Sequence, residues 1–151
     1  MSFIRHYYHI VFTPKHRRPL ISQEVEKEVY MLLYHFLQKY KGYVIRINGM
    51  PDHVHILVSL PASVAVSEVV KIVKQETSKL IKERRLIRSW EGWEEGYSSF
   101  TCSYSEIEKV KTYIINQKKH HQSVTGIEEF REWLISNGIS PDSPYFPVSE
   151  L

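Results

Sequence analysis

The spacing of apolar residues changes along this chain in an order that restricts the fold more than any other feature. Two segments, from Ser22 to about Tyr40 and from about Ser63 to Arg85, place apolar residues three and four positions apart, as on one face of an α-helix. Shorter runs rich in β-branched and aromatic residues lie around them and are typical of strands. The predicted strands are Phe3–Phe12, Tyr43–Ile47, the run Met50–Leu60 and Tyr97–Cys102.

A third helix is predicted after the last strand, from Ser103 to about His120. The order is therefore strand, helix, strand, strand, helix, strand and an additional helix. Such a βαββαβ order is typical of an α+β, ferredoxin-like fold, a mostly antiparallel sheet with helices on one face. In this topology the first and third strands are neighbours at the centre of the sheet. The third helix is expected to cover the other face.

Short-range signals predict where these elements begin and end. Ser22 is a plausible N-cap of the first helix, and Gly42 lies just beyond its end. Asn48-Gly49 predicts a turn between the second and third strands. The run from Ser103 to Glu106 predicts a capping box at the start of the third helix.

The size and composition are those of one ordinary globular domain. The chain has 151 residues, of which 42% are hydrophobic and 25% charged. No apolar run approaches the roughly 18 residues that span a bilayer, and no signal peptide is recognised at the start. A single cysteine, Cys102, excludes an internal disulfide and a Cys-rich zinc site. We therefore expect a cytoplasmic protein with one domain over residues 1–151.

The end of the chain is expected to be irregular. From about residue 138 onward it contains Pro141, Pro144 and Pro147, which disfavour regular structure.

Positive charge is concentrated in the first third of the chain. The formal net charge is only +3, but Lys15, Arg17 and Arg18 lie together with His16. The cluster suits either a solvated loop or contact with the phosphates of a nucleic acid. Nearby rings such as Tyr7 and Tyr8 could stack on exposed bases.

His53 and His55 are separated by one residue inside a predicted strand, so their side chains leave the same face. Two imidazoles held side by side can bind a divalent metal or a phosphate. The alternative is a pair of structural histidines that face solvent or a carboxylate.

Tyr113 and Gln117 are four residues apart in the predicted third helix, so they also share a face. They could be a packing tyrosine and a surface amide. In the functional interpretation, two imidazoles and one amide oxygen leave at least two positions open on a divalent ion, where a phosphate oxygen can bind. A tyrosine hydroxyl has a pKa near 10, so its attack on phosphorus needs stabilisation of the phenolate.

Three sequence blocks carry a resemblance to a known family. They are Tyr8-His9-Ile10-Val11-Phe12-Thr13-Pro14-Lys15-His16-Arg17-Arg18-Pro19, Met50-Pro51-Asp52-His53-Val54-His55 and Tyr113-Ile114-Ile115-Asn116-Gln117. In this order and at these distances they resemble the single-tyrosine HUH transposases of small insertion sequences, the IS200-like family. The stretch Tyr97–Ser103 follows the family pattern only loosely.

The resemblance implies an HUH endonuclease fold, with the third helix carrying the nucleophile. Tyr113 would cut single-stranded DNA, leaving a 5′-phosphotyrosine and a free 3′-hydroxyl. His53, His55 and Gln117 would be ligands of Mg²⁺ or Mn²⁺. The substrate would contain hairpins at the ends of an insertion sequence. The protein would act as a homodimer in which the tyrosine helix can complete the partner's site in trans.

Two other functions stay open at the level of the sequence. A ferredoxin-like sheet with exposed aromatic residues is also used by non-catalytic modules that bind single-stranded nucleic acid. A histidine-based metal hydrolase would need no covalent intermediate. Tyr113 distinguishes the three, since only the transposase requires its hydroxyl.

Overall fold

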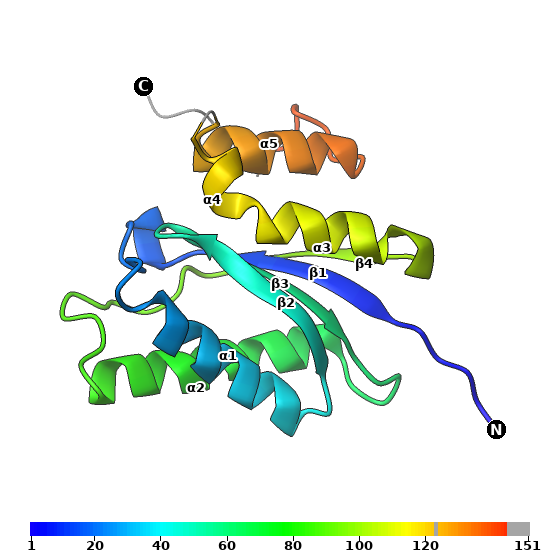
Figure 1. Cartoon of the computed structure of the whole chain (residues 1–151), viewed down its shortest axis with the longest axis horizontal. Helices are drawn as coiled ribbons and strands as arrows, with labels where there is room; N and C mark the ends of the chain where they lie inside the picture. Colours follow the sequence, from blue (N-terminus) through cyan, green and yellow to red (C-terminus); the bar gives the residue numbers. More distant parts are fainter. Residues whose placement is uncertain (123, 145–151) are drawn as a thin grey trace.

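The fold is a four-stranded antiparallel sheet with helices on both faces (Figure 1). The computed structural model describes residues 1–122 and 124–144. The strands are β1 (Tyr7–Phe12), β2 (Tyr43–Met50), β3 (His53–Ser59) and β4 (Ser98–Cys102), and their order in the sheet is β2-β3-β1-β4. The predicted α+β, ferredoxin-like arrangement is confirmed, and β1 and β3 are the central strands.

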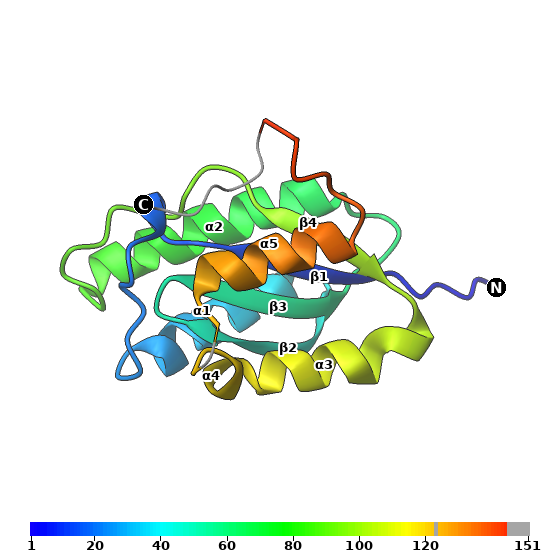
Figure 2. The same ribbon diagram turned by 90° about the horizontal axis from the view of Figure 1, so that it is seen from above.

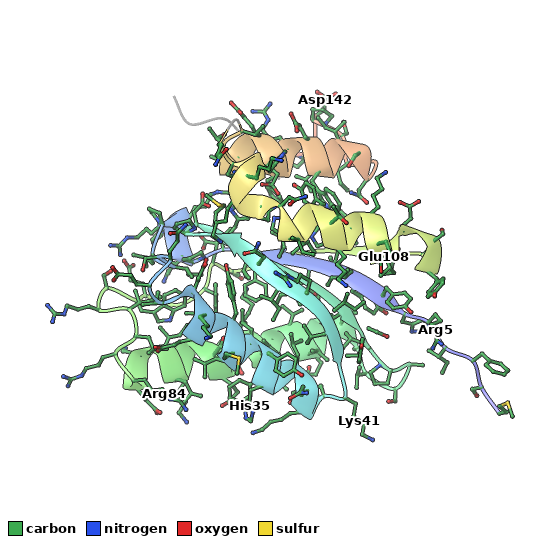
Figure 3. The ribbon with its side chains drawn as sticks, viewed as in Figure 1. Arg5, His35, Lys41, Arg84, Glu108 and Asp142 are labelled. Carbon is green, nitrogen blue, oxygen red and sulfur yellow. The ribbon has the colours of Figure 1, made fainter. Side chains whose placement is uncertain are left out.

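Each face of the sheet has its own set of helices (Figures 1 and 2). One face is covered by α1 (Glu26–Lys39) and α2 (Val66–Glu83). The opposite face is covered by α3 (Ile107–Ile115), α4 (Gln117–His120) and α5 (Gly126–Ser136). Charged side chains such as Lys41 and Arg84 point outward from these layers (Figure 3). No helix in the part of the chain that the structure describes has the length and apolarity needed to cross a bilayer.

The alternation of side chains along β3 creates two different environments. Val54, Ile56 and Val58 join the main hydrophobic core beneath α1 and α2. The residues between them leave the other face, where Leu57 packs with a small cluster from α3. His53 and His55 share that face with Leu57. One strand therefore contributes to the apolar core and, on its reverse side, to a polar site.

Several predicted boundaries differ from the observed ones. β1 begins at Tyr7, because the preceding residues run into solvent and Phe3 is 90% exposed. α1 begins at Glu26 with Val25 as N-cap. Ser22 therefore does not cap this helix through its side chain, although its carbonyl accepts from the Glu26 N–H.

The turn between β2 and β3 lies at Pro51-Asp52, so the predicted turn at Asn48-Gly49 is wrong. Asn48 and Gly49 instead pair with β3, opposite His55 and Val54. Gly49 is required by close packing, because a Cβ at this position would lie 2.2 Å from the carbonyl oxygen of His53.

The third predicted helix is divided at Asn116 into α3 and α4. The predicted capping box from Ser103 to Glu106 does not form, and Tyr104–Glu106 is a short 3-10 helix. A capping box forms instead between Thr125 and Glu128, at the start of α5. The prediction did not include α5.

Residues 137–144 contain turns and bends and no helix or strand. The rest of the tail for which we expected irregular structure, including Pro147, lies outside the described residues.

Candidate active site

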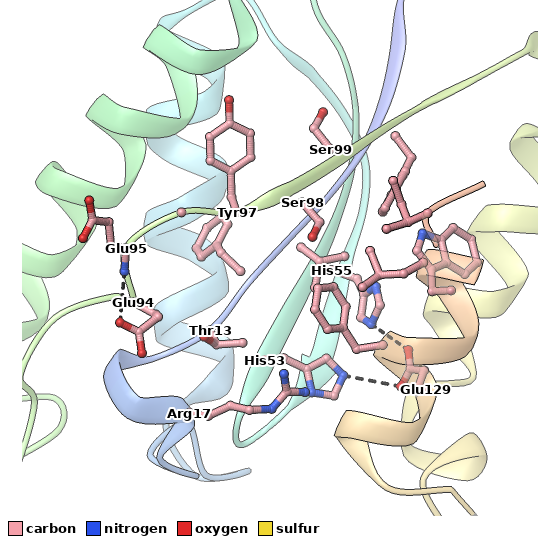
Figure 4. Close-up of a pocket in the computed structure, with 18 of the residues that line it drawn as sticks. Thr13, Arg17, His53, His55, Glu94, Glu95, Tyr97, Ser98, Ser99 and Glu129 are labelled. Atoms are coloured by element: carbon pink, nitrogen blue, oxygen red, sulfur yellow. Dashed lines mark hydrogen bonds and ion pairs between the residues drawn. The ribbon is translucent and has the colours of Figure 1, made fainter. Parts of the chain in front are cut away.

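The two histidines of β3 point away from the main core, toward α4 and α5 (Figure 4). Each is only 3% exposed, and their ring centroids are 5.1 Å apart. The predicted shared face is therefore present, but it is covered by helices and does not face solvent.

His53 is surrounded by oxygen atoms. Its Nδ1 donates to Asp52 Oδ1 at 2.7 Å, and its Nε2 lies 3.1 Å from Gln117 Oε1. Glu129 Oε2 is 3.6 Å from the same Nε2. Burial lowers the pKa of His53, but the hydrogen bond to Asp52 and the nearby Glu129 carboxylate outweigh burial and raise this pKa to about 9.

For His55, burial outweighs the effect of the neighbouring carboxylate on the pKa, in contrast to His53. Its Nε2 lies 2.9 Å from Glu129 Oε1 and its Nδ1 lies 2.8 Å from His9 Nε2. Burial dominates here and lowers the pKa of His55 to about 4, with a further lowering from the neighbouring His53. The paired imidazoles thus differ in their preferred charge.

Tyr113 on α3 reaches the same site. Its ring centroid is 5.8 Å from that of His55, and its ring stacks on Trp133 at 5.1 Å. The hydroxyl donates a hydrogen bond to Glu129 Oε1. Burial and this carboxylate raise the pKa of the Tyr113 phenol well above its usual value.

Gln117 is fully buried, so it is not a surface amide. Its Nε2 donates to Glu129 Oε1 at 3.0 Å, which leaves its Oε1 turned toward His53. The break at Asn116 does not separate Gln117 from Tyr113, and both side chains reach the histidine pair.

Glu129 on α5 is the central residue that sequence reasoning missed. It is 3% exposed and contacts both histidines of β3, Tyr113 and Gln117. His121 also forms an ion pair with its Oε2. The Thr125-x-x-Glu128 pattern could have predicted the start of α5, but no local pattern distinguishes Glu129 from the exposed acidic residues beside it.

The donor atoms fit a divalent cation. Ligand atoms of His53, His55 and Glu129 all lie within 4.8 Å of one another. Within residues 1–122 and 124–144, His55 Nε2 and Glu129 Oε2 are buried without a well-oriented hydrogen bond. Burial raises the pKa of Glu129, but the close approach of His121, His53 and His55 outweighs burial and keeps the carboxylate ionised. Imidazole nitrogen and carboxylate oxygen are both ligands that divalent metals accept.

A cavity of about 650 Å³ opens beside these groups (Figure 4). The histidine pair and Glu129 form one side, and Tyr97, Ser98 and Ser99 lie on the opposite side. This volume is within the range of about 300–1,000 Å³ typical of ligand pockets. A substrate group in the cavity would lie against the histidine pair.

The three predicted phosphate contacts occupy different surroundings. Arg17 lines the cavity, where it forms an ion pair with Asp52 at 3.7 Å and lies over the Phe130 ring. Arg18 forms an ion pair with Glu91. Lys15 is exposed and lines a separate hollow beside α2.

Comparisons with known proteins agree on one family. The family model described as "Transposase IS200 like" matches residues 2–117. The chain is 28% identical over 115 residues to the transposase for insertion sequence element IS200 of Salmonella typhimurium, covering 73% of this chain and 75% of that protein. It is 27% identical over 119 residues to the ISDra2 transposase TnpA of Deinococcus radiodurans, covering 73% and 82%.

Two solved structures share the fold. A candidate transposase from Deinococcus radiodurans R1 has a TM-score of 0.61 and 21% identity, covering 77% of this chain and 93% of that one. A REP-associated tyrosine transposase bound to a REP hairpin has a TM-score of 0.60 and 12% identity, covering 100% and 92%. The match to the family model extends over most of the chain and includes both histidines of β3, Tyr113 and Gln117. This chain therefore belongs to the IS200-like transposase family.

Proposed function

We propose that this transposase cleaves and rejoins single-stranded DNA through a covalent bond to Tyr113, with a divalent metal bound at the histidine pair. One observation carries the proposal: a phenol and an amide oxygen converge on two imidazoles, and these imidazoles line a cavity large enough for a substrate group. The side chains come from β3, α3 and α4, so only the folded chain assembles them.

His53 and His55 would hold the metal, with Gln117 as the predicted third ligand. Glu129 is a further ligand candidate, because its carboxylate is ionised and lies among the same donor atoms. When bound, Mg²⁺ or Mn²⁺ would polarise the phosphate and offset the charge that develops during attack. Two imidazoles favour Mn²⁺ over Mg²⁺, because Mg²⁺ prefers oxygen ligands.

Tyr113 would supply the nucleophile. Its oxygen forms a bond to phosphorus while the bond from phosphorus to the 3′-oxygen breaks, giving a 5′-phosphotyrosine and a 3′-hydroxyl. The phenol is neutral here and donates a hydrogen bond to Glu129, so its proton must leave during attack, and one proton must reach the departing 3′-oxygen. The covalent ester conserves the bond energy, which allows a 3′-hydroxyl to reverse the reaction and rejoin the strand.

The proposed substrate is single-stranded DNA with hairpins at the ends of an insertion sequence. The REP-associated relative bound to a REP hairpin supports this choice, and so does the position of Arg17 beside the cavity. We propose that residues 1–151 act as one domain and meet this DNA in the cytoplasm.

The proposal is tested by incubating the protein with Mn²⁺ and a labelled single-stranded hairpin, followed by a denaturing gel. We expect a labelled protein band that is absent from Tyr113→Phe and His53→Ala. Tyr104→Phe is the matched control, because Tyr104 is exposed on the short 3-10 helix before α3, and it should keep the band. Binding without a band on any hairpin would favour the non-catalytic module. Cleavage without a band would favour the hydrolase.

The homodimer is a separate proposal, based on the family resemblance. Tyr113 reaches the histidine pair of its own chain, with its ring centroid 5.8 Å from that of His55, which supports assembly of the site in cis. Light scattering across micromolar concentrations tests this. A dimer mass supports the proposal, and a monomer mass at every concentration contradicts it.

A further inference from the structure

His9 is a fully buried histidine that contacts the proposed metal site from a neighbouring strand. It lies on β1, which pairs with β3 so that Val11 is opposite His55 and His9 is opposite Leu57. Side chains two apart on a strand share a face, so His9 and His55 are diagonal neighbours on the face that carries the site. Their rings are joined by a contact of 2.8 Å between His9 Nε2 and His55 Nδ1.

We propose that His9 is a positioning residue: it accepts the Nδ1–H of His55 and so leaves the Nε2 lone pair of His55 available to the metal. This inference rests on the metal site of the proposed function. His9 itself is not a ligand in this assignment, because its Nε2 is occupied by the hydrogen bond to His55.

When the proposed metal is bound at His55 Nε2, the position of the proton follows. His55 Nε2 belongs to the group of ligand atoms, 2.9 Å from Glu129 Oε1. A nitrogen that binds a cation carries no proton, and a neutral imidazole carries one proton in total. The proton of His55 must therefore be on Nδ1, where His9 Nε2 is the acceptor. His9 then carries its own proton on Nδ1.

The ring of His9 is held firmly enough to orient its neighbour. Trp133 packs edge-on against it, with ring centroids 4.6 Å apart, and Tyr113 lies on another side at 6.5 Å. A metal-binding histidine commonly donates its second N–H to a fixed acceptor, which sets its tautomer and orientation. For His55 that acceptor is an imidazole on a central strand.

The two histidines proposed as metal ligands therefore donate their second N–H to different kinds of acceptor. Asp52, a carboxylate, accepts from His53, whereas a neutral acceptor serves His55. A second carboxylate in place of His9 would add negative charge close to the ionised Glu129, which His55 already contacts. An imidazole supplies the acceptor without that repulsion.

The test compares Mn²⁺ affinity, measured from the free-Mn²⁺ signal in electron paramagnetic resonance, for the wild type and four variants. His9→Gln keeps an acceptor, and His9→Leu is similar in size without one. Leu57→Val is the packing control, because Leu57 is buried directly opposite His9. His53→Ala removes a proposed ligand.

Loss of a residue that supports a metal ligand typically weakens metal binding by about 10–100-fold. We expect such a loss in His9→Leu, and affinities within about threefold of the wild type in His9→Gln and Leu57→Val. Nitrogen-15 spectra of the Zn²⁺-loaded wild type should show His9 protonated at Nδ1 only. Thermal unfolding without metal shows whether each variant is folded.

A failure of the proposed metal site and a failure of the role of His9 give different results. If the wild type binds Mn²⁺ no better than His53→Ala does, the metal site is wrong and the role of His9 falls with it. If the wild type binds tightly and His9→Leu binds equally well, the role of His9 alone is overturned. A proton on His9 Nε2 in the Zn²⁺-loaded protein overturns it as well.

Discussion

Glu129 accepts a hydrogen bond from the hydroxyl of Tyr113, although the two residues are sixteen positions apart and belong to different helices. The same carboxylate contacts both histidines of β3. Helix α5 lies beyond residue 117, where the match to the family model ends. A residue outside the matched segment therefore connects the proposed nucleophile to the proposed metal ligands.

The first prediction concerns the acidity of Tyr113. Burial and the negative charge of Glu129 both raise the pKa of this phenol. Glu129→Gln removes the charge and should lower the pKa of Tyr113, because a nearby negative charge disfavours the phenolate. Ultraviolet titration of the metal-free protein measures this pKa. The absorbance change that belongs to Tyr113 is the part that Tyr113→Phe removes, in the wild type and in Glu129→Gln. An unchanged pKa would mean that burial alone controls the phenol.

The second prediction concerns the pH dependence of stability without metal. The pKa of His53 is raised to about 9, so its stabilisation is complete below its unfolded pKa of 6.5 and is lost as the pH rises toward 9. The pKa of His55 is lowered to about 4, so its stabilisation is present above pH 6.5 and is lost as the pH falls toward 4. Stability should therefore be greatest near pH 6.5.

Each difference of about 2.5 from the value of 6.5 corresponds to about 3 kcal/mol. Denaturant unfolding at pH 5, 6.5 and 8.5 with a chelator measures the profile. His53→Gln should flatten its alkaline side, and His55→Gln should make its acidic side less steep, since His9 and Glu129 also have lowered pKa values. A profile that both substitutions leave unchanged would contradict this assignment.

The third prediction concerns the end of the tyrosine helix. Asn48 on β2 donates to the carbonyl oxygens of Ile114 and Ile115, two of the terminal carbonyls that a helix leaves without partners. Asn48→Ala should reduce the free energy of unfolding by about 1–3 kcal/mol. It should also slow formation of the tyrosine adduct by about 10- to 100-fold, because Tyr113 would lose its fixed position.

Denaturant unfolding and single-turnover labelling measure these two effects. Gln75→Ala, at an exposed position of α2, is the control and should change neither. Equal adduct rates in Asn48→Ala and the wild type would show that β2 does not position the tyrosine.

The fourth prediction concerns how much Lys15, Arg17 and Arg18 each contribute to phosphate contacts with DNA. Each lost phosphate contact reduces the slope of log K against log salt by about 0.7 for single-stranded DNA. Arg17→Gln should show this full reduction, because Arg17 lines the cavity. Arg18→Gln and Lys15→Gln should show less, because neither Arg18 nor Lys15 lines this cavity. Binding measured between about 50 and 200 mM salt gives the slopes. Equal slopes for all three would refute the ranking.

The fold was predictable because it depends on periodic patterns. The alternation in β3 and the helical spacing of the first two helices each extend over many residues, so errors at their ends do not change the order of elements. His53 with His55, and Tyr113 with Gln117, were identifiable for the same reason, since each pair has the spacing of its own element.

What could not be predicted depends on contacts between distant residues. Glu129 resembles Glu128 and Glu132 in the sequence, and only the packing of α5 on the sheet makes it the buried one. The contact of His9 with His55 requires the register of β1 on β3. Asn48-Gly49 has the composition of a tight turn, but the side chain of Asn48 binds the end of α3 and the hairpin turns at Pro51-Asp52 instead.

The missing side chain at Gly49 has a consequence for catalysis. The two backbones meet so closely there that any Cβ would collide with the carbonyl of His53, so a bulkier residue would push the hairpin toward another alignment. A slip by a single position reverses which side of the sheet every side chain occupies. Both imidazoles would then face the main hydrophobic core and Val54 would face the proposed metal site, so the absence of a Cβ at position 49 keeps the two histidines on the side of the sheet that carries the candidate site.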